Sequence, residues 1–449
     1  MSKDANNVKQ VMILLGAGAS PSPIPTTAQL TEWLCQDFRR YRLPCPHESA
    51  NLMSVSEQGA HDWRQPYFGA LHDLLKRYYG RHDYLLNFEM LLHTAWLIGE
   101  ASSSSGTRSP LDSLLHPFFR FDEQFSSFGG MAMEALVEDA GNEILKLIAK
   151  QQDDKRIQMG TPLAHGIARL AEEAALRIFS LNYDTVALVR PKKTFSVHTG
   201  FSSDSAENQQ FHPTLVHQRE SSDHLFYQLH GSVHFGYENA TDIVRFSSLC
   251  NALKNRDRSG IVTLPHQDRT SNIRLPAVMG FRKPDAILRE PFFSYHHAFV
   301  EEAVTCKRWL IVGYGGADDD INAVLRHAWT VHESDADFRC VIVNWLDPHM
   351  WEYEPNEDGS CQGVMHDLEY GDTRIHNPQI PTIYPMYGAW KPLKVVAAGV
   401  PAPKRQALRF RKGIPLQSLD DERVKLSIVG TDLAFSCYLD EIMKFLDIM

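Results

Sequence analysis

The sequence predicts an α/β fold, in which a mostly parallel sheet is flanked by helices. Five short apolar runs are each typical of a buried strand, and each ends in a glycine or a polar cluster. Stretches with helical spacing of apolar residues separate several of these runs, which is the pattern of strand–helix–strand units. The five runs are 11–15, 177–181, 225–229, 309–312 and 338–343.

The first run, 11–15, leads into the glycine turn GAGAS at 16–20, and an amphipathic segment begins just beyond. This order is Rossmann-like: small residues let backbone N–H groups approach the phosphates of a nucleotide. The third glycine of the dinucleotide fingerprint is missing, and the nearest acid at the expected offset, Asp37, falls within a helical pattern. A dehydrogenase-type site is therefore disfavoured. The chain also lacks the Gly-Lys-Ser/Thr of an ATPase P-loop.

Helical patterns fill most of the chain between the first two strands. One helix is expected from Thr26 or Thr27 to Tyr41, and residues of about 45–155 are expected to form a large helical insertion. Later helices are expected after the cap Thr161, over 292–304, and from the acids at 318–320, which suit a helix N-terminus. For these acids a capping and solvated role is the default expectation.

The last hundred residues carry weaker patterns. A strand is expected over 394–398 and an amphipathic helix over 433–449. Between them lies a basic cluster without an acid, made of Lys404, Arg405, Arg409, Arg411 and Lys412. We therefore expect a main domain over 1–395 and a C-terminal extension over 396–449 that offers a possible oligomer or partner contact.

Composition narrows the class of protein. The chain has 449 residues, 43% of them hydrophobic, and a net charge of −10, so its surface as a whole does not indicate nucleic-acid binding. It has neither an apolar run long enough to cross a bilayer nor an apolar core in residues 1–10, and we expect a cytoplasmic location. Its seven cysteines form no Cys-x-x-Cys pair, which predicts reduced thiols, no zinc ribbon and no metal site.

The clusters that end the five runs are expected to meet. Ligands of open α/β sheets bind outside the carboxyl ends of the strands. GAGAS at 16–20, NYD at 182–184, HGS at 230–232, GYGG at 313–316 and Asn344 should therefore converge on one crevice.

Five motifs in this order resemble the sirtuin superfamily: GAGAS with IPT at 24–26, LNYD at 181–184, LHG at 229–231, VGYG at 312–315 and VIVN at 341–344. The resemblance runs from about residue 11 to 344, interrupted by the helical insertion. Classical sirtuins carry a four-cysteine zinc module between the histidine and the later glycine motif, where this chain has only Cys250 and Cys306. The chain is therefore more similar to the zinc-free sirtuin-like domains of bacterial anti-phage defence, which hydrolyse NAD.

The resemblance implies roles for individual residues. Asn182 would lie by the nicotinamide ribose and position the attacking water, and His230 would act at the ribose hydroxyls. Asp184 would lie near the nicotinamide amide. The pyrophosphate would be held by Gly16, Ala17, Gly18 and Ser20, and the adenosine half would be contacted by Gly313, Tyr314 and Asn344. The remaining histidines, His296 and His297 among them, are expected to be surface or packing residues.

The chemistry fits these residue types independently. Cleavage of the nicotinamide–ribose bond passes through an oxocarbenium-like state, by analogy with other glycosidic cleavage. The nicotinamide leaves as a neutral molecule, so no strong general acid is required. A neutral histidine can take a ribose proton, and an asparagine amide can hold a water.

The sequence thus predicts an NAD⁺ glycohydrolase that releases nicotinamide and ADP-ribose and depletes NAD in anti-phage, abortive-infection defence. NAD is the substrate. Two alternatives stay open: a protein deacylase or ADP-ribosyltransferase, and a non-catalytic NAD-binding assembly subunit. The resemblance also implies a homo-oligomer and a hexameric HerA-type ATPase partner. Nucleic acid would be met only indirectly, and no membrane contact is expected.

Overall fold

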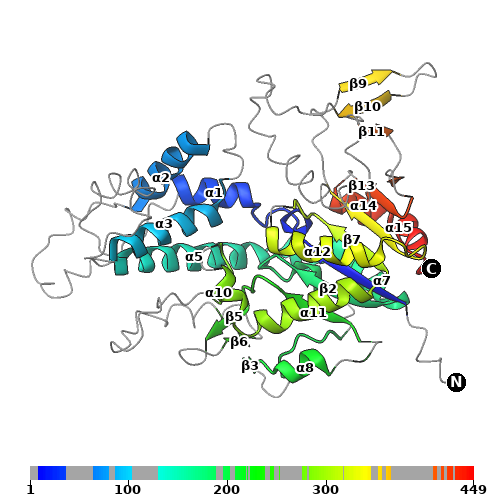
Figure 1. Cartoon of the computed structure of the whole chain (residues 1–449), viewed down its shortest axis with the longest axis horizontal. Helices are drawn as coiled ribbons and strands as arrows, with labels where there is room; N and C mark the ends of the chain where they lie inside the picture. The colour runs from blue at the N-terminus through cyan, green and yellow to red at the C-terminus, as the bar shows by residue number, and fades with distance from the viewer. Residues whose placement is uncertain are drawn as a thin grey trace, which may run out of the picture.

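A central sheet with helices on both faces organises the computed structural model of the chain (Figure 1). The structure describes residues 9–36, 64–79, 86–103, 130–188, 196–202, 208–218, 220, 223–237, 243–246, 252, 276–280, 283–316, 318–344, 352–355, 361–365, 408–411, 416–418, 422–427 and 430–449. Seven strands follow the order β12-β13-β8-β7-β1-β2-β4. All neighbours pair in parallel except β12 and β13, which pair antiparallel. The predicted α/β fold with a mostly parallel sheet is confirmed.

The five predicted apolar runs are five strands of this sheet. Their bounds are Gln10–Leu15 for β1, Ala175–Ser180 for β2, Leu225–Gln228 for β4, Arg308–Val312 for β7 and Arg339–Val343 for β8. The chain moves outward from β1 to β2 and β4, and then returns to the other side of β1 with β7 and β8. The direction of winding therefore reverses between β1 and β7, which is where ligands of open α/β sheets bind.

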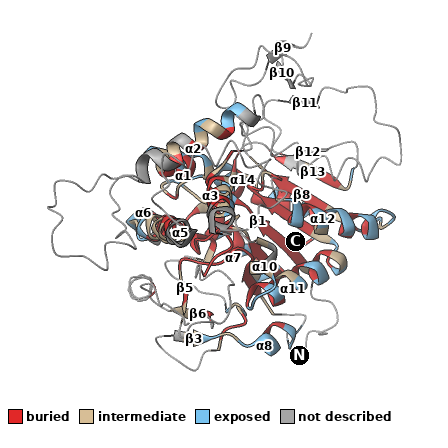
Figure 2. Cartoon of the chain, turned by 60° about the vertical axis from the view of Figure 1, so that its left-hand side comes forward, coloured by how far each residue is buried: buried red, intermediate tan, exposed pale blue. Residues whose placement is uncertain are grey.

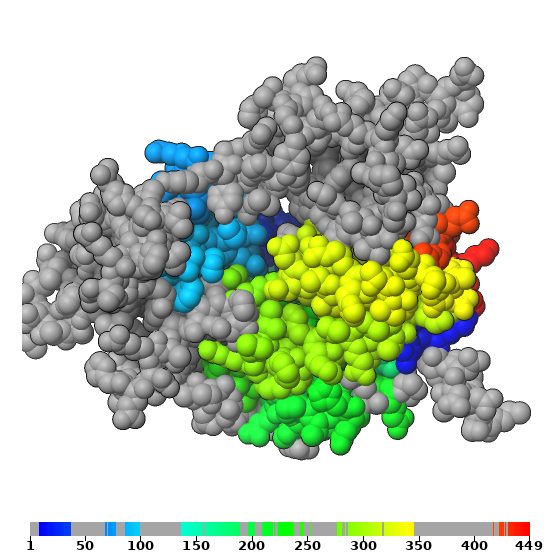
Figure 3. Space-filling model, viewed as in Figure 1, coloured from blue at the N-terminus to red at the C-terminus, as the bar shows by residue number. Residues whose placement is uncertain are grey.

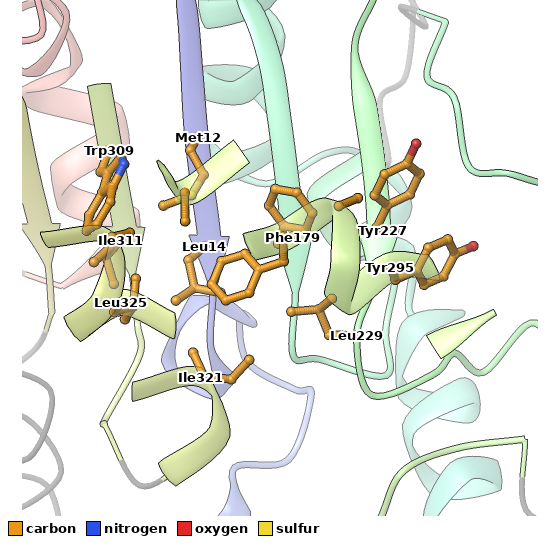
Figure 4. Packing of buried hydrophobic residues seen from close by; sticks show 14 of the residues in the cluster. Met12, Leu14, Phe179, Tyr227, Leu229, Tyr295, Trp309, Ile311, Ile321 and Leu325 are labelled. Atoms are coloured by element: carbon orange, nitrogen blue, oxygen red, sulfur yellow. The ribbon is translucent and has the colours of Figure 1, made fainter. Parts of the chain in front are cut away.

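One face of the sheet is covered by α11 (Phe292–Thr305) and α12 (Asp319–His332), close to the predicted positions. Their apolar side chains pack on Met12, Leu14 and Phe179 (Figure 4). The strands are buried along most of their length (Figure 2), because helices cover both faces and leave them no solvated side. Figure 3 shows α11 and α12 on one outer face of the molecule.

The other face is covered by α7 (Pro162–Glu173), α14 (Thr431–Cys437) and α15 (Leu439–Phe445). Helix α7 begins as predicted, with the Thr161 hydroxyl accepting a hydrogen bond from the Ala164 N–H at 3.2 Å. The predicted helix over 433–449 is two helices, α14 and α15, which meet at Tyr438.

Apart from β11 (Leu408–Arg411), which pairs in a separate small sheet, the described part of the predicted C-terminal extension belongs to this main layer. Strand β13 (Val424–Ser427) pairs in parallel with β8, and β12 (Gln417–Ser418) follows it at the edge of the sheet. Helices α14 and α15 bury Phe435, Ile442 and Leu446 in the same core as α7. The C-terminal residues therefore complete the sheet and its helical cover.

Four of the described helices between β1 and β2 pack together; the last three lie within the expected helical insertion of about 45–155, and the first lies where a helix from Thr26 or Thr27 was expected. They are α1 (Thr27–Gln36), α2 (Arg64–Tyr79), α3 (Phe88–Ser103) and α5 (Gly130–Gln152). We call them the helical layer. Their core includes Tyr183 and Val233, which follow the carboxyl ends of β2 and β4. The helical layer therefore packs against the end of the sheet where the predicted site residues lie.

Smaller elements complete the described structure. The sheet β3-β6-β5 joins Asn208–Gln210, Ile243–Phe246 and Phe235–Tyr237, and the sheet β11-β10-β9 joins Leu408–Arg411, Cys361–Met365 and Glu352–Pro355. The short helices are η2 (Ala17–Ala19), α6 (Lys155–Gln158), η5 (Val186–Leu188), α8 (Pro213–His217) and α10 (Lys283–Ile287). The expected strand over 394–398 and the side chains of the basic cluster lie outside the described residues. None of the described helices combines the length and apolarity needed to cross a bilayer.

Candidate functional site

The glycine turn after β1 packs directly on the turn after β7. The Gly16 N–H donates to the Val312 carbonyl at 2.9 Å, and the Gly18 N–H donates to the Gly313 carbonyl at 2.9 Å. A Cβ at position 16 would lie 2.6 Å from the Cα of Tyr314. The glycines therefore allow two backbones to meet at the point where the sheet reverses its direction of winding.

This packing changes the role expected for the turn. The N–H groups of Ala19 and Ser20, like those of Gly16 and Gly18, donate to backbone carbonyls of the protein. Residues Ala17–Ala19 within the turn form the short 3-10 helix η2, and α1 begins only at Thr27. Close packing of two turns thus accounts for the glycines by itself, and pyrophosphate binding by this turn stays a prediction that rests on its position.

Asn182 ties the end of β2 to the glycine turn. Its side-chain Nδ2 donates to the Gly16 carbonyl at 2.9 Å and to Ser20 Oγ at 3.0 Å. Because a carbonyl can only accept, the group that faces Gly16 must be the NH₂ end of the amide. The amide oxygen is therefore turned the other way, and no described residue is recorded as donating to it. That oxygen can accept a hydrogen bond from a water or a ligand.

Asp184 also contacts the glycine turn, through Ser20. Ser20 Oγ donates to Asp184 Oδ2 at 2.6 Å, and the Val186 N–H donates to Oδ1 at 3.0 Å. Burial raises the pKa of Asp184, and these two hydrogen bonds oppose that rise. Gln228 of β4 supports the segment by donating to the Asp184 carbonyl at 3.0 Å. Both carboxylate oxygens are thus engaged within the protein, which makes Asp184 a support for Ser20.

His230 follows β4 and is only 6% exposed. Its Nε2 lies 3.0 Å from Oδ2 of Asp318. The next residue, Gly231, has a φ of 98°, and a Cβ there would lie 2.6 Å from the Pro276 carbonyl. The glycine after the histidine is therefore required by backbone conformation and close packing.

Asp318 connects this histidine to a lysine. Lys283 of α10 places its Nζ 2.5 Å from Asp318 Oδ2, while Asp318 Oδ1 caps α12 by accepting from the N–H groups of Asp320 and Ile321. Burial favours the neutral acid, but His230 and Lys283 outweigh it and hold the pKa of Asp318 well below its ordinary value. The expected capping role is confirmed for Asp318, whereas its expected solvated position is wrong because the side chain is only 10% exposed. Asp319 and Asp320 are exposed, as expected.

Two further residues interact electrostatically with His230: Glu89, which the sequence analysis did not name, and His296, which it expected to be a surface or packing residue. Glu89 in the first turn of α3 accepts a hydrogen bond from Tyr183 at 3.2 Å, and its pKa is raised by burial against the opposing charges of His230 and Lys283. Burial, aided by the charge of His230, lowers the pKa of His296 to about 4. Its Nε2 is buried, and none of the described residues forms a hydrogen bond with it.

The residues that were expected to contact the adenosine half of NAD lie at the ends of β7 and β8. Gly313 has a φ of 61° and packs on Gly18 and Ala19. The Tyr314 ring lies in the core, with its hydroxyl donating to Asn322 Oδ1 at 2.9 Å, and burial raises its pKa. Asn344 approaches the Tyr314 carbonyl at 3.4 Å. Tyr314 can therefore meet a ligand only through its backbone.

The predicted site residues thus lie around the carboxyl ends of neighbouring strands. Searches among related proteins add no assignment, because no protein-family model matches the chain and no curated protein is significantly similar to it. Among the residues that the structure describes, no group of three or more His, Cys, Asp or Glu side chains is arranged to hold a metal ion.

Proposed function

We propose that this protein is an NAD⁺ hydrolase of Rossmann-like, zinc-free type that cleaves the nicotinamide–ribose bond to nicotinamide and ADP-ribose. The proposal rests on three groups that follow neighbouring strands at the same end of the sheet. A glycine turn, an asparagine with a fixed amide and a buried histidine follow β1, β2 and β4, which are neighbours in the sheet. The order of the sequence motifs, which resembles sirtuin-like NAD-hydrolysing domains, supports the same reaction.

The orientation of Asn182 suits the hydrolytic step. Both hydrogens of its amide are engaged by Gly16 and Ser20, so its oxygen is fixed in direction. An oxygen held in this way can accept one hydrogen of a water and orient the water lone pair toward the anomeric carbon. The oxocarbenium-like state needs this oriented nucleophile more than it needs an acid.

The surroundings of His230 suit proton handling at the ribose. The imidazole is largely removed from solvent, and a carboxylate lies within 3.0 Å. Such an environment strengthens electrostatic interactions with a bound sugar. In the cell, turnover of this kind would deplete NAD, which is the defence role implied by the resemblance.

The direct test is incubation of the purified full chain with NAD⁺, followed by chromatography of the products. We expect nicotinamide and ADP-ribose in equal amounts. His230→Ala and Asn182→Ala should each lower turnover by about 100-fold or more, the range typical of a lost proton-transfer or water-positioning group. Since Asn182 also supports the glycine turn, thermal unfolding of each variant must be measured in parallel.

A matched control is available on α11. His297→Ala removes an exposed imidazole and should leave turnover unchanged. Ser20→Ala removes only one of the two partners of Asn182 Nδ2, so an intermediate loss is expected. Full activity of both His230→Ala and Asn182→Ala would rule out the proposed reaction at this site, and NAD⁺ binding without turnover would favour an assembly subunit instead.

A further inference from the structure

Charged and titratable groups from four elements surround His230. Glu89 comes from α3, Lys283 from α10, His296 from α11 and Asp318 from the N-cap of α12. Asp318 Oδ2 lies 3.0 Å from Nε2 of the imidazole, and Lys283 contacts the same carboxylate oxygen. The three side chains therefore form a row, which we call the charge chain, that runs from the end of β4 to α10.

We propose that Asp318 and Lys283 are positioning residues that fix the orientation and the charge state of the His230 imidazole. The inference rests on the proposed function for the role of His230 at the ribose. The side chains of Asp318 and Lys283 are only 10% and 17% exposed, so their charges act on the imidazole through a medium of low dielectric constant.

The two residues act on His230 in opposite directions. A carboxylate 3.0 Å from the ring favours the imidazolium, which cannot accept a ribose proton. The ammonium of Lys283, 2.5 Å from the same oxygen, offsets that charge and favours the neutral ring. Together they place two opposite charges beside the ring, so that removing either charge changes the electrostatic environment of the imidazole.

The double role of Asp318 can be separated by substitution. Its Oδ1 caps α12 and its Oδ2 faces His230 and Lys283. Asparagine is an equally good N-cap residue, so Asp318→Asn keeps the helix cap and replaces the charged oxygen that faces His230 and Lys283 with a neutral NH₂ donor. Lys283→Met keeps the apolar stem and removes the opposite charge. Asp319→Asn, which removes an exposed acid from the same turn, is the matched control.

The experiment is a pH titration of the histidine ¹³C resonances in the full chain, with the His230 signal assigned by its loss in His230→Gln. We expect Asp318→Asn to move the titration midpoint of His230 to lower pH and Lys283→Met to move it to higher pH. Each shift should be roughly 1 pH unit, as for one nearby charge. Asp319→Asn should leave the midpoint unchanged.

The pH dependence of NAD⁺ cleavage gives a second readout. If the neutral ring is the active form, the cleavage rate should fall on the acid side of its pH profile. That fall should move to lower pH in Asp318→Asn and to higher pH in Lys283→Met. Shifts in the same direction, or no shift of the resonance in either variant, would overturn the inference. Opposite resonance shifts without any NAD⁺ cleavage would support the charge chain and reject the proposed reaction, so the two failures are distinguishable.

Discussion

Asp184 shows how a single buried carboxylate can hold a neighbouring hydroxyl and, through it, an amide. Its two oxygens accept from Ser20 Oγ and the Val186 N–H, and burial raises its pKa. Ser20 in turn accepts from Asn182, so the carboxylate holds the hydroxyl that orients the amide. The resemblance placed Asp184 near the nicotinamide amide, and the geometry gives it a supporting role two hydrogen bonds from Asn182 Nδ2.

The raised pKa of Asp184 predicts a pH-dependent stability. A carboxylate with a folded-state pKa above its unfolded value of about 3.9 binds its proton more tightly in the folded protein. Its contribution to the free energy of unfolding is therefore largest below the unfolded-state pKa. The contribution falls as the pH rises from the unfolded-state pKa to the folded-state pKa. The wild type should gain stability relative to Asp184→Asn as the pH is lowered from 7 toward 4. Urea unfolding of both proteins at several pH values measures this difference.

A constant difference between the two proteins across that range would contradict the raised pKa. Asp223→Asn offers a control, because that residue precedes the amino end of β4, whereas the site lies at the carboxyl end, and its carboxylate accepts from the Glu220 N–H. The comparison isolates the buried acid from the general effect of pH on the surface charges.

At the scale of elements, the turns after β1 and β7 behave as one unit. Gly313 has a φ of 61°, and any Cβ there would enter the space of Gly18 and Ala19. We expect Gly313→Ala to cost about 1–2 kcal/mol of backbone strain, plus the cost of separating the two turns. Gly160→Ala, at a φ of 90° but remote from these turns, should show the backbone cost alone. Thermal unfolding compares the two variants.

Equal destabilisation by the two substitutions would mean that the turns can move apart freely. If the turns are coupled as the structure indicates, Gly313→Ala should also weaken any NAD⁺ binding, because Asn182 is bonded to the Gly16 carbonyl within the same unit. Gly160→Ala should leave NAD⁺ binding unchanged.

The strands of the sheet were predictable because their signal is local. Runs such as 11–15 and 309–312 are apolar throughout, as expected for strands covered on both faces. Strand β13 was missed because it alternates Val424 and Leu426 with polar residues over only four positions, and its partner β8 lies far away in sequence. Short strands added at an edge carry too little pattern to be read alone.

Within the candidate site, the positions of residues that directly follow a strand were predictable, and those of residues within helices were not. Asn182 and His230 stand where a strand ends, so topology alone places them near the ligand end of the sheet. Glu89, Lys283 and His296 lie inside ordinary helical patterns, and only tertiary packing brings them to His230. No local sequence signal marks a residue whose role depends on a neighbour far away in the sequence.

At the scale of the whole molecule, the C-terminal helices close the fold next to its first turn. Thr431 Oγ1 at the start of α14 donates to the Gly18 carbonyl at 3.0 Å, and the Gly430 N–H donates to Asn344. Phe435 of the same helix packs against Gly166 of α7, in the core that also holds β1. The last residues of the chain therefore support the glycine turn and the end of β8 together.

This arrangement predicts that the C-terminal residues stabilise the whole sheet. Phe435→Ala should lower the free energy of unfolding by about 3–5 kcal/mol, the usual cost of removing a buried aromatic ring, and the loss should appear in the main unfolding transition. Leu433→Ala, on the same helix but 45% exposed, should cost far less. Urea unfolding followed by tryptophan fluorescence measures both, since Trp309 and Trp329 lie in the core. A separate C-terminal appendage would instead leave the main transition unchanged in Phe435→Ala, because its packing would not be linked to that of β1 and β8.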